Sequence, residues 1–317
     1  MSHTLTSAAG SPAAVPTTDP TGAGTALVAD DGRTLAASWF EPPIGRAHAV
    51  AVLSAATGVP RGFYRGFAQW LAGRGYAVLT YDYRGIAGSR RGPVRALREE
   101  PATMRDWALL DMSAALAAAE ARRATQGLPL LLVGHSFGGN AIAFARGVER
   151  ADALLAVGSQ LGEPRLYPGV HRWTAEFFFR AVLPTTVALH GHLPAWTLGG
   201  GAQPLPPGVA RDWARWGLTR GWAFADPVMR QHRAAAALAV PVHLWDVSDD
   251  LTFAPARAVD ALAAQFRNAT VQRHTLRPAD VGAARLGHFG AFRREPGPRA
   301  WERLLAPLEA ACPALRC

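Results

Sequence analysis

The chain has 317 residues, of which 49% are hydrophobic and 18% are charged, and its formal charge is +9. This composition is typical of a folded globular protein and excludes a disordered chain, a collagen and a small disulfide scaffold. At this length we expect one large α/β domain or two small ones, with a sizeable core in either case.

All of the positive charge comes from arginine, because the sequence contains no lysine. The arginines are spread along the chain, and their densest groups are pairs such as Arg90 and Arg91. A nucleic-acid-binding protein is expected to concentrate basic residues on one face or tail, interleaved with aromatic residues. We therefore expect no nucleic-acid partner.

Residues 1–24 are rich in Ser, Thr, Ala, Pro and Gly and have no basic segment followed by an apolar one. This pattern predicts a disordered tail rather than a signal peptide. No apolar stretch reaches the roughly 18 residues of a membrane span. The longest candidate, residues 181–198, contains two prolines and two histidines. We expect no membrane span and a cytoplasmic location.

Strands and helices alternate along most of the remaining chain. The predicted strands are residues 25–29, 34–40, 48–54, 77–81, 128–133, 152–157, 241–247 and 270–276. The predicted helices are residues 62–72, 104–123, 140–146, 256–266 and 299–311. The alternation predicts an α/β fold with a mostly parallel sheet flanked by helices. The first two strands form a hairpin at its antiparallel edge.

The alternation is interrupted in residues 162–235, which contain five tryptophans, three consecutive phenylalanines and many Pro and Gly residues. We interpret this segment as a helical cap insertion over the carboxyl ends of the strands, where α/β sheets place their sites. The core then comprises residues 25–161 and 236–317.

The strongest motif is Gly134-His135-Ser136-Phe137-Gly138, which follows a predicted strand and precedes a predicted helix. This is the G-x-S-x-G pattern in its expected setting. The serine occupies a strained, tight turn, so the residues two before and two after it must be small. The turn is expected to present the Ser136 hydroxyl above the sheet edge as a nucleophile.

A serine nucleophile needs a base, and the base needs a carboxylate that orients it. In this setting the acid and then the histidine follow the serine along the chain. His288 lies in a glycine-flanked loop between the last strand and the last helix and is the predicted base. The acid is Asp250 or its neighbour Asp249, with Asp250 favoured, since a one-residue shift in the strand end exchanges them.

An oxyanion hole needs two backbone N–H groups. The first is expected from Phe137, at the start of the helix after the nucleophile. The second is expected from the loop at residues 55–58, and we choose Ala56 with Thr57 as the alternative.

No metal or cofactor is expected. His190 and His192 could suggest a metal pair, but no spaced third ligand accompanies them. No phosphate-binding loop is present either.

These motifs resemble the α/β-hydrolase superfamily, and more narrowly its branch of serine aminopeptidase-like and monoglyceride-lipase-like proteins, from Thr25 to the C-terminus. The matching segments are residues 56–60, 75–79, 82–85, 134–138, 248–250 and 287–290. The resemblance implies an eight-stranded sheet with a cap. It also implies that Ser136, Asp250 and His288 form the catalytic triad.

Two positions depart from the pattern of these relatives. In the stretch that usually reads D-x-R-G-x-G-x-S, Ala87 replaces a glycine, which affects loop geometry. The oxyanion loop reads Ser54-Ala55 where many relatives have His-Gly. The second departure leaves the second oxyanion donor open.

Together these features predict a serine hydrolase that cleaves a carboxylic ester or related acyl bond through an acyl-enzyme on Ser136. The aromatic cap suggests a small-molecule acyl substrate of apolar character. Three alternatives stay open: an aminopeptidase, for which Glu163 or Glu176 would have to meet the substrate amine, an acyltransferase, and a non-catalytic binding module. The oligomeric state is not indicated.

Overall fold

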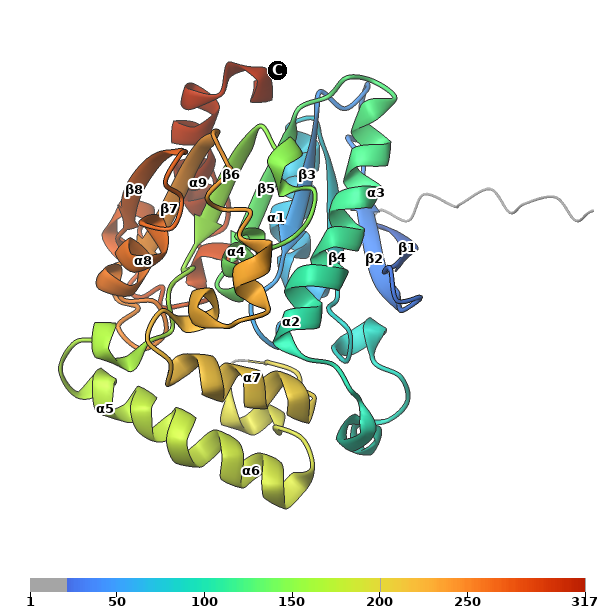
Figure 1. Cartoon of the computed structure of the whole chain (residues 1–317). Helices are drawn as coiled ribbons and strands as arrows, with labels where there is room; N and C mark the ends of the chain where they lie inside the picture. The colour runs from blue at the N-terminus through green and yellow to red at the C-terminus, as the bar shows by residue number, and fades with distance from the viewer. Residues whose placement is uncertain (1–21, 200, 317) are drawn as a thin grey trace, which may run out of the picture.

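The computed structural model describes residues 22–199 and 201–316, and it arranges eight strands in one sheet (Figure 1). The sheet order is β1-β2-β4-β3-β5-β6-β7-β8. The strands are β1 (Ala23–Val28), β2 (Thr34–Phe40), β3 (Ala49–Ser54), β4 (Tyr76–Tyr81), β5 (Leu130–His135), β6 (Ala153–Val157), β7 (Pro241–Val247) and β8 (Thr270–Leu276). The β1–β2 and β2–β4 pairs are antiparallel and the others are parallel, which confirms the predicted fold class.

Helices cover both faces of this sheet (Figure 1). The α-helices of the described residues are α1 (Arg65–Gly73), α2 (Met104–Asp106), α3 (Met112–Ala124), α4 (Phe137–Ile142), α5 (Gly169–Phe177), α6 (Leu183–His190), α7 (Pro207–Gly217), α8 (Ala256–Ala263) and α9 (Pro298–Ala311). Helices α1 and α9 pack together on one face, while α3 and α4 pack on the other. In α1, Phe67 and Leu71 are four residues apart and both fully buried, as expected of an amphipathic helix.

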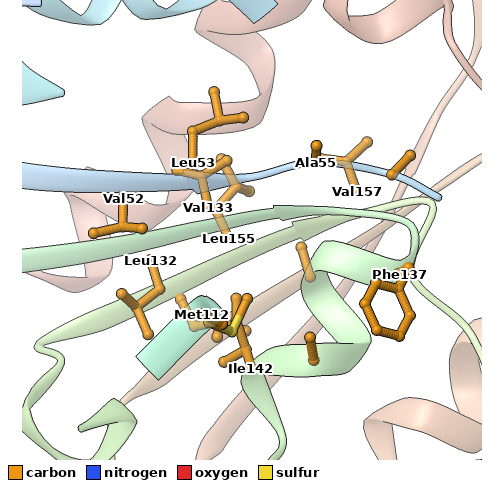
Figure 2. Packing of buried hydrophobic residues seen from close by; sticks show 14 of the residues in the cluster. Val52, Leu53, Ala55, Met112, Leu132, Val133, Phe137, Ile142, Leu155 and Val157 are labelled. Carbon is orange, nitrogen blue, oxygen red and sulfur yellow. The ribbon is translucent and has the colours of Figure 1, made fainter. Parts of the chain in front are cut away.

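The central strands are mostly apolar because both of their faces are covered. Every residue of β3 and of β5 is buried. Figure 2 shows Val52, Leu53, Leu132 and Val133 of these strands packed among buried side chains of their neighbours. Burying one such Val or Leu side chain contributes about 1.5–3 kcal/mol. The rigid core fixes the positions of the loops that leave the strands.

The structure corrects the helix predicted over residues 140–146. The observed helix, α4, begins at Phe137, directly after the strand-to-helix turn, and ends at Ile142. Gly138 and Gly139 weaken the helical pattern but are needed for close packing at the turn. The helix ends early where the carbonyl of Ala143 accepts a hydrogen bond from the amide of Ala235.

The helix predicted over residues 104–123 is also modified, because a π-helical turn at Trp107–Asp111 separates α2 from α3. This turn places the Asp111 carboxylate 2.7 Å from the guanidinium of Arg84, in the loop after β4. The extra residue of a π turn changes which side chains face the sheet.

A helical insertion lies between β6 and β7, and its helices α5, α6 and α7 group together beyond one end of the sheet (Figure 1). An ion pair attaches it to the core: Arg105 of α2 bonds to Asp226 at 2.8 Å. Within the insertion, Asp226 also pairs with Arg215 of α7 at 2.6 Å. Most of the predicted tail lies outside the described residues, and β1 already begins at Ala23. Within residues 22–199 and 201–316, no helix has the length and apolar character needed to cross a membrane.

Candidate active site

Ser136 stands in the sharp turn between β5 and α4, with φ of +52°, a left-handed conformation that residues other than glycine seldom adopt. The flanking glycines are sterically required. A Cβ atom at Gly134 would lie 2.3 Å from the backbone of Gly139, and one at Gly138 would lie 2.1 Å from the carbonyl oxygen of Ser54. The G-x-S-x-G spacing therefore follows from packing of the helix against two strands.

The imidazole of His288 and the carboxylate of Asp250 form a buried pair. Nδ1 of His288 lies 2.6 Å from Oδ2 of Asp250, and both side chains are almost completely buried. The other carboxylate oxygen of Asp250 accepts the amide N–H of Phe253 at 3.0 Å. With its Nδ1 directed at the carboxylate, the ring has its Nε2 left for proton exchange with a substrate or a hydroxyl.

Asp249 has a different role, which the sequence alone did not indicate. Its two carboxylate oxygens accept the amide N–H groups of Leu286 and Gly287, at 2.9 and 2.8 Å. These are the two residues directly before His288. Asp249 therefore holds the loop that carries the imidazole, while Asp250 contacts the imidazole itself.

A second buried network lies under the turn and also escaped sequence reasoning. The amide N–H of Ala56 donates to the hydroxyl of Tyr64 at 2.9 Å, and that hydroxyl lies 2.8 Å from Nδ1 of His135. Nε2 of His135 lies 2.9 Å from the backbone oxygen of His288. That oxygen can only accept, so Nε2 carries the proton and the Tyr64 hydroxyl donates to Nδ1.

The protonation state of His135 agrees with this arrangement. Complete burial is the main cause that holds the pKa of His135 well below the ordinary value, and the electrostatic effect of the adjacent His288 ring lowers it further. A neutral ring has one donor and one acceptor nitrogen, as the network requires. The Ala56 amide, our first choice as an oxyanion donor, is therefore already bonded within the protein.

Ser136, His288, Phe137 and Thr57 line one narrow cavity of about 40 Å³. A wider cavity of about 270 Å³ adjoins it beneath the insertion. The residues common to both linings are Gln160, Gly162, Leu198, Trp213 and Phe253. The two cavities are therefore continuous past these five residues.

Comparison with known proteins agrees with this geometry. Residues 46–198, just under half of the chain, match the family model described as serine aminopeptidase, S33. The chain is an α/β-hydrolase, and its matched segment is similar to the serine aminopeptidase-like branch. The matched residues of this hydrolase include the Ser136 turn and end before Asp250 and His288, so the last two assignments depend on the geometry above. No curated protein sequence matches the hydrolase.

Solved structures share the fold of the hydrolase at low sequence identity. A soluble variant of monoglyceride lipase from Saccharomyces cerevisiae, in complex with a substrate analogue, is 14% identical with a TM-score of 0.67, covering 96% of this chain and 99% of that one. A putative aryl esterase from Burkholderia cenocepacia is 18% identical with a TM-score of 0.55, covering 91% and 98%. A puromycin-hydrolysing peptidase from Mycobacterium tuberculosis is 19% identical with a TM-score of 0.53, covering 95% of this chain and 41% of that one.

The two departures noted in the sequence have structural counterparts in the hydrolase. Ala87 has φ of +39°, so it occupies a left-handed position that glycine adopts without strain. Ser54 bonds to the hydroxyl of Tyr81 at 3.0 Å at the end of β3. Around His190 and His192, as elsewhere in the described part of the chain, no three His, Cys, Asp or Glu residues gather as a metal site would require.

Proposed function

We propose that this hydrolase cleaves a carboxylic ester or a related acyl bond through a covalent acyl-enzyme on Ser136. The observation that carries the proposal is the buried His288–Asp250 pair, which lines the same cavity as a serine on a strained strand-to-helix turn. His288 accepts the serine proton as the hydroxyl attacks the carbonyl carbon and returns it to the leaving group. Asp250 holds the imidazole in the required tautomer. Water then attacks the acyl-enzyme with His288 again as base.

For the oxyanion hole we propose the amides of Phe137 and Thr57. Phe137 begins α4, where the helix dipole favours negative charge. Thr57 replaces Ala56 as the second donor because the Ala56 amide already donates to Tyr64. Removing one such donor typically costs about 3 kcal/mol of transition-state stabilisation.

An ester with an apolar acyl group is favoured over an aminopeptidase substrate. An aminopeptidase would need a carboxylate facing the substrate amine, and no carboxylate among the described residues lines either cavity. Glu163 is buried and bonds to Arg165 and to the amide of Gly221. Glu176 pairs with Arg180 on the outer part of the insertion. Neither carboxylate is placed to bind an amine beside Ser136.

The test is covalent labelling combined with turnover. We expect a fluorophosphonate to label Ser136 and 4-nitrophenyl esters of short and medium chains to be hydrolysed. Ser136→Ala should abolish both while leaving the melting temperature nearly unchanged. Transfer of the acyl group to an added alcohol in preference to water would instead identify an acyltransferase. Absence of both labelling and turnover would leave a binding module.

Residues 162–235 are proposed as the cap and residues 25–161 and 236–317 as the catalytic core. The partner we propose is a small-molecule acyl substrate. The cytoplasmic location expected from the sequence stays a prediction.

A further inference from the structure

Trp222 combines two unusual features at the cavity that contains Ser136. Its backbone φ is +51°, and its side chain is 2% exposed. Its indole Nε1–H is buried and has no hydrogen-bond partner among the residues that the structure describes. Buried donors are nearly always paired, and strained backbone is concentrated at functional sites.

Nearby indoles show that this fold can satisfy a buried N–H group. Trp216, whose ring meets that of Trp222 edge-on at 5.1 Å, donates to Asp226 at 2.8 Å. Trp107 donates to the backbone oxygen of Arg84 at 3.0 Å. The indole N–H groups of Trp245 and Trp301 also lack partners in the described part of the chain, but neither residue lines the two cavities. Trp222 differs from them by its place beside the nucleophile.

Gly162 lies directly over the unpaired donor. A Cβ atom at Gly162 would be 3.2 Å from Nε1 of Trp222. Gly162 lines both the narrow and the wide cavity. Because Gly162 has no side chain, no Cβ atom stands beside the indole N–H, where Gly162 and Trp222 both line the narrow cavity.

Gln160 contributes an unpaired acceptor where the two cavities meet. Its Nε2 donates to the backbone oxygen of Phe253 at 2.9 Å, which fixes the orientation of the amide. Its Oε1 is buried without a partner within residues 22–199 and 201–316. Gln160 lines both cavities, as Gly162 does. A donor and an acceptor thus border one otherwise largely apolar passage.

We infer that Trp222 and Gln160 form a polar subsite for a substrate oxygen, and that the natural substrate is an oxygenated acyl ester rather than a plain alkyl one. A hydroxyl group satisfies both residues, because it accepts from Trp222 and donates to Gln160. A keto or ether oxygen satisfies Trp222 alone. This inference rests on the proposed ester hydrolysis, which places the reacting carbonyl at Ser136. The acyl chain then extends past Gln160 and Gly162 into the wide cavity.

The experiment compares 4-nitrophenyl esters of one chain length. One ester is plain, a series has an ether oxygen in place of one methylene at successive positions, and a last one has a hydroxyl at the best position. We expect kcat/KM to rise by about tenfold for the ether at one position and further for the hydroxyl, since each neutral hydrogen bond contributes about that factor. No preference for any oxygenated ester over the plain one would overturn the inference.

Two variants assign the preference to the indole. Trp222→Phe keeps an aromatic ring and removes the N–H, so the ratio of kcat/KM between oxygenated and plain esters should fall about tenfold. Gly162→Ala keeps the indole and covers it with a methyl group, and it should lower the same ratio even if Trp222→Phe does not fold. Trp213→Phe, in the same two cavities, is the matched control and should change both esters alike. An unchanged ratio in Gly162→Ala and Trp222→Phe would refute the subsite.

A binding experiment tests the subsite independently of the proposed ester hydrolysis. If no ester is hydrolysed, the subsite is measured by calorimetric binding of the corresponding methyl esters to the intact protein. Tighter binding of the oxygenated methyl ester, lost in Gly162→Ala, supports the subsite without any turnover. Equal binding of plain and oxygenated methyl esters overturns it.

Discussion

The hydroxyl of Tyr64 accepts the amide N–H of Ala56 and donates to Nδ1 of His135, which immediately precedes Ser136. His135 in turn donates to the backbone of His288. One tyrosine and one neutral histidine therefore connect the proposed oxyanion loop, the nucleophile turn and the loop of the base. Each group in this network is a fixed donor or acceptor, so the network sets positions and does not transfer protons during the reaction.

Removing the Tyr64 hydroxyl should loosen the oxyanion loop. In Tyr64→Phe the buried amide of Ala56 loses its acceptor, which costs about 1–3 kcal/mol of stability. We expect kcat to fall about tenfold, with a smaller change in KM, because the adjacent Thr57 amide is held less precisely. Steady-state kinetics and urea unfolding measure both effects.

Tyr76→Phe is the matched control for this variant. Tyr76 is buried, and its hydroxyl lies 3.0 Å from a carboxylate oxygen of Glu309 and 2.8 Å from the backbone oxygen of Leu315. Tyr76→Phe should lower the free energy of unfolding by an amount similar to Tyr64→Phe and leave kcat unchanged. An equal loss of kcat in the two variants would indicate that Tyr64 acts through global stability alone.

Replacing Asp249 or Asp250 by asparagine should lower kcat by very different factors. Asp250→Asn removes the charge that orients and stabilises the His288 imidazole, so kcat should fall by about three to four orders of magnitude. Asp249→Asn keeps one acceptor oxygen for the two amides before His288, and we expect about a tenfold loss of kcat. The measurement is kcat on the best 4-nitrophenyl ester. A larger loss in Asp249→Asn would make Asp249 the acid of the triad.

The sequence predicted the parts of the site that depend on pattern and chain order. The bounds of β7 and β8 agree with the predicted strands, and the G-x-S-x-G motif located Ser136 because its glycines are steric requirements. The choice between Asp249 and Asp250 needed coordinates, because adjacent side chains after a strand point in different directions. The bond from Ala56 to Tyr64 could not be foreseen, since side-chain identity says nothing of where a backbone N–H points.

Ala87→Gly should stabilise the fold. An L-residue in the left-handed region costs about 1–2 kcal/mol, and glycine removes this strain while adding some freedom to the unfolded chain. We therefore expect a net gain of about 1 kcal/mol in the free energy of unfolding. Ala117→Gly, at an exposed position within α3, should lose about 0.5–1 kcal/mol instead. A loss of stability in Ala87→Gly would show that the alanine side chain contributes packing that outweighs the strain.

Stability should fall as the pH decreases below about 6.5, partly because of His243 in β7. Burial, with a smaller effect of the adjacent His274, lowers the pKa of His243 to about 4. The unfolded chain binds a proton at this residue near pH 6.5. Between these two values the unfolded state holds more protons than the folded state, so acidification favours unfolding. His243→Asn should therefore reduce the slope of the free energy of unfolding against pH, by up to the equivalent of about one bound proton. Urea unfolding across this pH range measures the slope. His232→Asn replaces an exposed histidine, so it is the control and should leave this slope unchanged. An unaltered slope in His243→Asn would show that the His243 imidazole is protonated in the folded protein as readily as in the unfolded chain.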